Sequence, residues 1–315
     1  MTTPGITREA IAEAAHKIAP FIRRTPVIGV KVEGVSLPVK LKLELLQHSG
    51  SFKARGAFNT LVGAKIGAGG VATASGGNHG AAVAYVCREL GYKARIFVPE
   101  TSPSAKVARI ASYGAEIVQK GANYSEASGL CEAYMAATGA VGVHAYDAVP
   151  TLEGQGTLAA EFEEQAPDID TVLVAVGGGG LIGGIAAWYQ SKVTVIGVEP
   201  ITCNTLQAAM AAKDRLAIKP SGLAVDSLGA SMVGKLMFEI AQDHVARVAL
   251  VSDDEIRAAQ RKLWRDMQLV TEPGGAAAFA ALLSGAYKPQ KDERVGVVVC
   301  GANTSMDVFG KLFST

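Results

Sequence analysis

A lysine that follows a run of small polar residues is a candidate for imine chemistry. Lys53 stands where the segment Ser-Gly-Ser at 49–51 passes into a predicted helix, with the aromatic Phe52 directly before it. An amine beside a helix N-terminus and an aromatic ring can be partly desolvated, which lowers its pKa. Such an amine suits imine formation with a carbonyl cofactor. Taken alone, Lys53 has an alternative interpretation as an ordinary solvated surface lysine.

Four consecutive glycines join a predicted strand at 171–176 to a predicted helix at 181–189. They are Gly177, Gly178, Gly179 and Gly180. Glycine backbone lets N–H groups converge on an anion, and a helix N-terminus adds positive potential. The turn lacks the lysine of a nucleoside-triphosphate loop, although a dinucleotide pattern fits formally at 178, 180 and 183, with Glu199 as the candidate ribose partner. A tight turn without a ligand is the other alternative.

A second turn of the same design follows a predicted strand at 71–74. Its residues are Ser75, Gly76, Gly77, Asn78 and His79, and a helix is predicted to begin near position 80. Backbone N–H groups, a hydroxyl and an amide side chain suit a carboxylate. Two such turns fit a substrate with one acid group and a cofactor with one phosphate. The alternatives are an ordinary capped helix start and a structural histidine at position 79.

A cysteine ends a further predicted strand at 295–299. Cys300 precedes Gly-Ala-Asn at 301–303, and taken alone it fits a buried apolar thiol. No histidine is near it in sequence to activate a thiolate nucleophile. The four cysteines show no close pairing and no C-x-x-C, so neither a zinc site nor a disulfide framework is indicated.

Short apolar runs that alternate with helical patterns must position these groups. Most of the runs are continuous, as in parallel strands buried on both faces, and the alternation predicts parallel sheets. The segment 38–44 alternates apolar and polar residues and predicts a half-exposed strand. Thr7 and Ser252 are predicted to cap helices. The other predicted strands are 71–74, 94–98, 116–118, 171–176, 193–198 and 295–299, and the predicted helices include 80–90, 104–113, 155–165 and 181–189.

Composition bounds the class of protein. A chain of 315 residues exceeds the usual limit of one core, so two domains are expected. The 30 basic and 29 acidic side chains nearly cancel, which argues against nucleic acid or an anionic membrane as the main partner. The N-terminus has no apolar signal-peptide core, and no apolar stretch is long enough to span a bilayer. We therefore expect a cytoplasmic protein.

Eight short motifs follow one another through nearly the whole chain in the order of a known family. They are RTPV at 24–27, KLE at 42–44, GSFKARGA at 50–57, SGGNHG at 75–80, GQGT at 154–157, GGGG at 177–180, EP at 199–200 and CGAN at 300–303. Together they resemble the fold-type II pyridoxal-phosphate enzymes, in the branch of serine/threonine dehydratases and serine racemases. The resemblance implies an α/β fold like tryptophan synthase β, with two mainly parallel twisted sheets flanked by helices. It also implies a large cofactor-binding domain at 1–47 and 149–315 and a small domain at 48–148.

The resemblance also implies a role for each motif. Lys53 would bind the aldehyde of pyridoxal phosphate covalently and later remove the substrate's α-proton. Phe52 would lie near the ring, Asn78 would hydrogen-bond its 3′-oxygen, and Cys300 would face the pyridine nitrogen as a neutral partner. The phosphate would bind to Gly177, Gly178, Gly179 and Gly180, and the substrate to Ser75, Gly76, Gly77, Asn78 and His79.

Two positions depart from the family pattern. Racemases of this branch have a serine one residue before the Gly-Asn-His stretch, where this chain has Gly76. Because glycine has no side chain to reprotonate the α-carbon, elimination is favoured over racemisation. The family's divalent-cation site pairs a Glu before Pro with an Asp six residues later. This chain has Glu199 but Thr205 at the second position, so no metal is expected.

The resulting prediction is an ammonia-lyase that converts a small β-hydroxy amino acid to a 2-oxo acid and ammonia. L-threonine and L-serine are the expected substrates, and the branch implies a homodimer. The alternatives are a dehydratase for hydroxyaspartate or phenylserine, a serine racemase, and a non-catalytic nucleotide-binding α/β protein.

Overall fold

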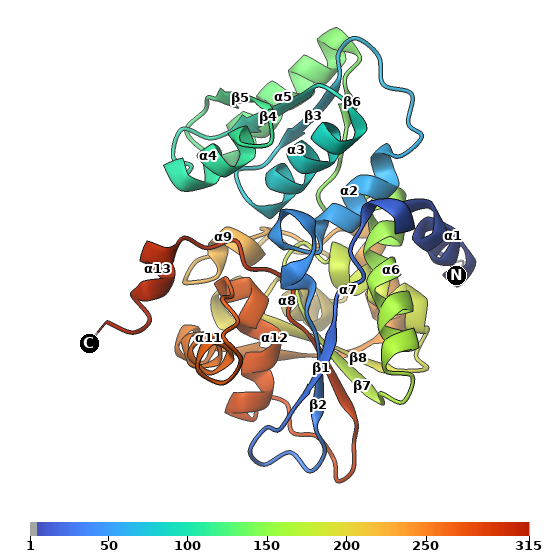
Figure 1. Ribbon diagram of the computed structural model, residues 1–315, viewed down its shortest axis with the longest axis vertical. Coiled ribbons are helices and arrows are strands. Elements are labelled where there is room, and N and C mark those ends of the chain that lie inside the picture. Colours follow the sequence, from blue (N-terminus) through green and yellow to red (C-terminus); the bar gives the residue numbers. More distant parts are fainter. Residues whose placement is uncertain (1–4, 315) are drawn as a thin grey trace.

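The computed structural model describes residues 5–314, which form two separate β-sheets (Figure 1). One sheet has six strands in the order β1-β2-β10-β7-β8-β9, and the other has four in the order β5-β4-β3-β6. Only β1 and β2 pair antiparallel, and every other neighbouring pair is parallel. The predicted α/β class with two mainly parallel sheets is confirmed.

The six-stranded sheet and its helices are called the large unit here. α12, with α11 packed against it, covers one face, and α7, α6 and α1 cover the other (Figure 1). Its strands are β1 Val27–Val30, β2 Val39–Lys42, β7 Thr171–Ala175, β8 Thr194–Pro200, β9 Val245–Val251 and β10 Val295–Val298. Its helices are α1 Arg8–Ile18, α6 Val149–Gln165, α7 Gly180–Tyr189, α8 Thr205–Ala212, α9 Val225–Leu228, α10 Lys235–His244, α11 Asp253–Met267, α12 Pro273–Ser284 and α13 Met306–Gly310.

The four-stranded sheet and its helices are called the small unit. Val71 and Ile96 pack into a core with α3, whereas Ala72 and Phe97 pack on the other face against α5. Both faces are therefore buried, which explains why these strands are continuous apolar runs. The strands are β3 Val71–Ala74, β4 Ala94–Val98, β5 Glu116–Gln119 and β6 Val141–Gly142, and the helices are α3 Asn78–Leu90, α4 Ser104–Ala111 and α5 Tyr124–Thr138.

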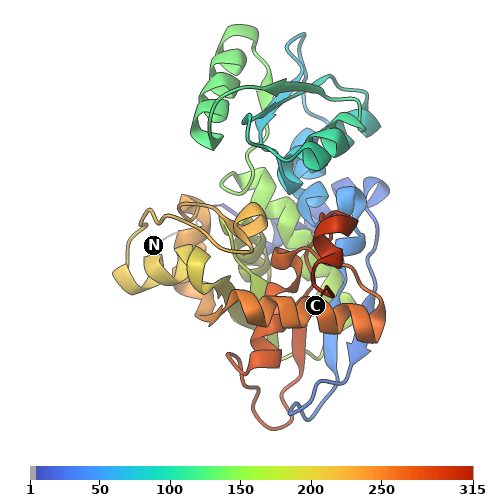
Figure 2. The ribbon, with the colours of Figure 1, turned by 90° about the vertical axis from the view of Figure 1, so that its left-hand side faces the viewer.

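The two units lie one above the other in both views, and α2 (Lys53–Leu61) lies between them (Figures 1 and 2). α2 packs against α6 of the large unit and against α3 of the small unit. The predicted domain boundaries after residues 47 and 148 stay a prediction, because a helix that contacts both units does not mark a boundary between them.

Most predicted elements are present within one or two residues of their predicted ends. Thr7 caps α1, and Ser252 forms a capping box with Glu255 at the start of α11, both as predicted. The strands β1, β6 and β9 are not among the predicted elements. Among residues 5–314, no helix is long and apolar enough to cross a membrane.

The predicted half-exposed strand at 38–44 is wrong in one respect, because two of its polar side chains are fully buried. The ammonium of Lys42 in β2 and the carboxylate of Glu44 are both fully buried. The alternation of polar and apolar residues indicates a solvated face only when the protein interior supplies no oppositely charged partners for the polar side chains. Here the polar face of the strand meets α2 and α6, which supply charged partners.

The buried charges form one network around Arg55, in the first turn of α2. The Arg55 guanidinium donates to Glu44 at 2.7 and 2.8 Å and to Glu161 at 3.0 Å, and Lys42 also pairs with Glu161. Burial opposes the charge of Glu44, but Arg55 outweighs it and holds the pKa of this carboxyl below its usual value. Two cations and two anions are thus balanced. The network fixes the start of α2 and therefore the backbone of Lys53.

Candidate active site

The carboxyl ends of three strands meet at a cavity between the two units. β7 leads into the glycine turn, β10 leads to Cys300, and β3 leads into the second turn. Parallel α/β sheets bind their ligands at the carboxyl ends of strands, so this is the expected position for a site. All the predicted cofactor-binding residues line this cavity, namely Phe52, Lys53, Asn78, Gly177, Gly178, Gly179, Gly180 and Cys300.

The glycine turn is held by bonds to its carbonyl groups. The Gly177 carbonyl accepts from the Thr205 hydroxyl at 3.1 Å, and the Gly178 carbonyl accepts from the Gly234 N–H at 3.0 Å. Gly179 has φ of +91°, which strongly favours glycine. α7 begins at the next residue, and the N–H groups of a first helical turn have no partner within the helix. The turn therefore offers N–H donors at a helix N-terminus to an anion.

Lys53 is the first residue of α2, and its amine reaches the far side of the cavity. Nζ donates to the carbonyl oxygen of Ala145 at 2.7 Å and lies 5.1 Å from the centre of the Phe52 ring. Burial lowers the pKa of Lys53 to about 8, although the nearby Cys300 and Glu272 oppose the shift. The lowered pKa predicted from the helix start and the aromatic neighbour is present.

The second turn opens into a neighbouring cavity of about 510 Å³ that Lys53 also lines. α3 begins at Asn78, so the backbone of this turn again meets a helix N-terminus. The predicted substrate-binding residues Ser75, Gly76, Gly77, Asn78 and His79 all line this cavity. At Gly76, an added Cβ would lie 2.7 Å from the Ser102 hydroxyl, so a side chain at this position would have to displace Ser102.

The imidazole of His79 forms its hydrogen bonds inside the small unit. Its Nε2 lies 2.8 Å from the Val143 carbonyl and 3.0 Å from the Thr73 hydroxyl, inside the small unit. Burial, with the nearby Lys53 charge, lowers the pKa of His79 to about 3, so the imidazole is neutral. The imidazole is therefore occupied within the small unit, and a contact of His79 with substrate, for which its backbone N–H would serve, stays a prediction.

Residues 18–301 match the family described as pyridoxal-phosphate dependent enzyme. The chain belongs to this family. It is 36% identical over 310 residues to a phenylserine dehydratase from Ralstonia pickettii, covering 96% of this chain and 94% of that protein. It is 34% identical over 306 residues to a catabolic L-threonine dehydratase from Staphylococcus aureus, covering 94% of this chain and 88% of that protein. The solved structure of maize serine racemase superimposes with a TM-score of 0.92 at 30% identity, covering 98% of this chain and 96% of that one.

The cavity of this pyridoxal-phosphate dependent enzyme fits its cofactor in three respects. Lys53 supplies an amine with a lowered pKa, and the glycine turn supplies donors for a phosphate. Cys300 is fully buried, its thiol donates to the Gly274 carbonyl at 3.4 Å, and burial raises its pKa. The thiol therefore stays protonated and uncharged, as the predicted neutral partner for the pyridine nitrogen would have to be.

Glu272 lines the cofactor cavity and is absent from the predicted site. Its carboxylate accepts a hydrogen bond from the Asn78 side chain at 2.6 Å, and Asn303 donates to the oxygen of the same Asn78 amide. Burial raises the pKa of Glu272 to about 7, although the Asn78 bond opposes the shift. An added Cβ at Gly275 would lie 2.0 Å from the Gly301 carbonyl, so glycine lets the start of α12 approach the end of β10. The run Pro-Gly-Gly after Glu272 is the sequence signal that could have located it.

Glu199 has a structural role in the large unit. Its carboxylate is fully buried and accepts from the Thr205 hydroxyl at 3.0 Å and from the N–H groups of Leu206 and Gln207 at 2.8 and 2.9 Å. It thus caps the start of α8. Because these bonds occupy both oxygens, Glu199 is not available to the ribose that a dinucleotide site would require.

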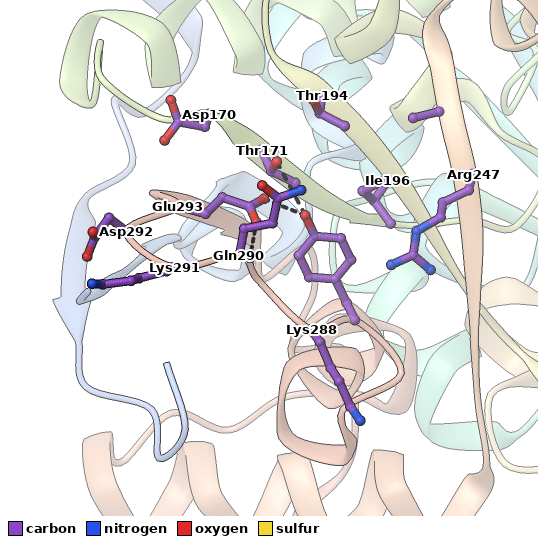
Figure 3. Close-up of a pocket in the computed structure, with 12 residues that line it drawn as sticks. Asp170, Thr171, Thr194, Ile196, Arg247, Lys288, Gln290, Lys291, Asp292 and Glu293 are labelled. Atoms are coloured by element: carbon purple, nitrogen blue, oxygen red, sulfur yellow. Dashed lines mark hydrogen bonds between the residues drawn. The ribbon is translucent and has the colours of Figure 1, made fainter. Parts of the chain in front are cut away.

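A second hollow of about 550 Å³ lies at the opposite end of the large sheet (Figure 3). Thr171 and Thr194, the first residues of β7 and β8, line it together with Tyr287, whose hydroxyl donates to Glu293. The amino ends of parallel strands are not where such sheets bind their ligands. None of the predicted site residues lines this hollow, and we assign no reaction to it.

The rate at which apoenzyme binds pyridoxal phosphate covalently should report the pKa of Lys53. At neutral pH about 10% of an amine with a pKa near 8 is uncharged, against ~0.03% of an ordinary lysine. We expect the rate, followed by the visible absorption of the bound cofactor, to rise with pH and to level off above about pH 8. A rate that continues to rise tenfold per pH unit up to pH 10 would contradict the lowered pKa.

Proposed function

We propose that this enzyme is an ammonia-lyase that converts a small β-hydroxy amino acid to a 2-oxo acid and ammonia, with L-threonine and L-serine as the first candidates. The observation that carries the proposal is the position of Lys53, whose amine has a lowered pKa and lines one cavity with the glycine turn at 177–180 and another with the helix-start turn at 75–79. The names of the two dehydratase relatives support the same reaction class.

The substrate's carboxylate would bind to the turn at 75–79, where backbone N–H groups meet the N-terminus of α3. The cofactor's phosphate would bind to the turn at 177–180. When bound, pyridoxal phosphate supplies an aldehyde carbon for imine formation and a ring that withdraws electrons from the α-carbon. The two turns together would orient the α-carbon toward Lys53, because they hold the two anionic ends in fixed positions.

Lys53 would then act as the general base that removes the α-proton. Loss of the β-hydroxyl with one proton as water, followed by addition of water and release of ammonia, balances the conversion to the 2-oxo acid. Because Gly76 carries no side chain, the face opposite Lys53 has no acid at that position, which favours elimination over racemisation. The proposal includes a homodimer, as the resemblance implies, and a cytoplasmic enzyme, as expected from the sequence.

The test is an assay for 2-oxo acids with holoenzyme and a panel of L-threonine, L-serine, L-threo-3-phenylserine and L-threo-3-hydroxyaspartate. We expect release of a 2-oxo acid and an equal amount of ammonia from at least one of them. Activity on none of the four would rule out the dehydratase while leaving the cofactor family unchanged. With L-serine, formation of D-serine faster than pyruvate would show that the inference from Gly76 is wrong and would favour the racemase alternative.

A further inference from the structure

Two tyrosines form one wall of the cavity proposed to bind substrate. Tyr124 is the first residue of α5 in the small unit, and Tyr146 lies on the segment that leads back to the large unit. Both line the cavity that Lys53 and the turn at 75–79 also line. Tyr124 is 58% exposed, whereas Tyr146 is half-buried. Of the two tyrosines, Tyr146 is therefore the one whose side chain is more shielded from solvent.

The ring of Tyr146 is held firmly in its place. It lies against Gly178 of the glycine turn, where an added Cβ would be 2.4 to 2.6 Å from three ring atoms. The His144 ring meets it edge to face, with centroids 5.0 Å apart and an angle of 81°. On its other side, Asp147 accepts from the N–H groups at the start of α10 at 2.8 and 2.9 Å. The Asp147 bonds thus hold the backbone beside residue 146, and the ring itself lies against Gly178 and His144.

The position of Tyr146 relative to the reacting groups is also fixed. Lys53 donates to the carbonyl of Ala145, the residue directly before Tyr146. The Tyr146 side chain therefore follows directly after the residue that binds the amine, and both side chains line the same cavity. With the substrate's carboxylate on the turn at 75–79, a substituent on the β-carbon would extend along this wall.

Charge in the cavity argues against an acidic substituent. Among the described residues that line it, the cationic side chains are Lys53 and Lys106, and Lys106 pairs with Asp226 at 3.1 Å. The imidazole of His79 is neutral and turned away. With Lys53 engaged by the cofactor and Lys106 paired, a second carboxylate on the substrate would find no free cation among these residues, whereas an aryl group would find an aromatic surface.

We propose that Tyr146 is a specificity-determining residue that gives this enzyme a preference for a β-hydroxy amino acid with an aryl group on the β-carbon, such as 3-phenylserine. The proposal rests on the proposed function and specifies its substrate class. Edge-to-face and offset-stacked aromatic pairs stabilise by an amount that corresponds to about 2- to 13-fold in an equilibrium. We therefore expect a preference of about 10-fold in kcat/KM for L-threo-3-phenylserine over L-threonine.

The test compares both substrates in holoenzyme variants. Tyr146→Leu replaces the ring with a smaller apolar side chain, and we expect it to lower kcat/KM for L-threo-3-phenylserine about 10-fold more than for L-threonine. Tyr146→Phe keeps the ring and is expected to keep the preference. Tyr92→Leu, a half-buried tyrosine of the small unit outside the cavity, is the matched control. Equal losses on both substrates in Tyr146→Leu would overturn the proposal.

A binding measurement separates this proposal from the proposed function. L-phenylalanine and L-alanine have no β-hydroxyl to eliminate, so their Kd values, read from the cofactor's visible absorption, report binding alone. Tighter binding of L-phenylalanine that depends on Tyr146, without turnover of any β-hydroxy amino acid, would support the proposed role of Tyr146 and contradict the proposed dehydratase function. Turnover of L-threonine, with L-phenylalanine bound no better than L-alanine, would support the proposed dehydratase function and contradict the proposed role of Tyr146.

Discussion

Replacing Lys53 with alanine is expected to lower kcat by on the order of 10⁴-fold or more. A well-placed general base contributes about 10²- to 10⁴-fold, and this variant also removes the amine that attaches the cofactor covalently. The structure has no substitute, because Lys106, the other cationic side chain among the described cavity residues, is paired with Asp226. The measurement is 2-oxo acid formation together with the visible absorption of the purified protein.

Two controls define the interpretation of that result. Lys192→Ala removes an exposed lysine of the large unit and should leave both activity and absorption unchanged. Circular dichroism should show that Lys53→Ala is folded, since the Arg55 network that fixes α2 is intact. Retention of a tenth of the activity, with normal absorption, would mean that another residue binds the cofactor.

Replacing Arg55 with methionine is expected to lower the free energy of unfolding by about 3–5 kcal/mol, which is the usual effect of removing one partner from a buried ion pair. The variant leaves the carboxylates of Glu44 and Glu161 with Lys42 as their remaining cation, in a place where Glu44 has no access to water. Urea unfolding followed by tryptophan fluorescence measures the change, because both tryptophans lie in the large unit.

An exposed ion pair provides the matched control for Arg55. Arg257 pairs with Asp254 at 2.7 Å on the surface of α11, and such pairs contribute at most about 1 kcal/mol. Arg257→Met should therefore be nearly neutral. The double variant Arg55→Met with Glu44→Gln should be more stable than Arg55→Met alone, because it removes the unpaired charge. Equal stability of the two variants would show that the burial of charge is not the cause.

The residues that the sequence places in the cavity are those with a local signature. The turn at 177–180 could be predicted from the sequence because four glycines between an apolar run and a helix have few functions other than anion binding. Lys53 could be predicted from the sequence because a Ser/Gly loop, an aromatic residue and a helix start adjoin it. These patterns depend on the backbone geometry of a few consecutive residues. The residue types in such a short segment largely determine that geometry, so it can be predicted from the sequence.

The residues that sequence reasoning misses acquire their role through packing over long distances. Glu272 contacts Asn78, which is 194 positions away in the chain. Tyr146 joins the cavity because its ring lies on Gly178. The exposed face predicted for the strand at 38–44 was wrong for the same reason, since Arg55 and Glu161 bring opposite charges to Lys42 and Glu44. His79 has the right position in the chain, but the Val143 carbonyl turns its ring away.

The pairing of β2 with β10 has a consequence for the order of assembly on the ribosome. The small unit's strands all come from 71–142, so they can pair early, whereas β2 must wait for β10 as its parallel neighbour. At about 5–20 residues per second, that wait lasts on the order of 10–50 s. During it the β1–β2 hairpin has an unpaired edge, which is a template for wrong pairing. Because Cys300 follows β10, the nascent chain cannot complete its cofactor cavity before residue 300 has emerged.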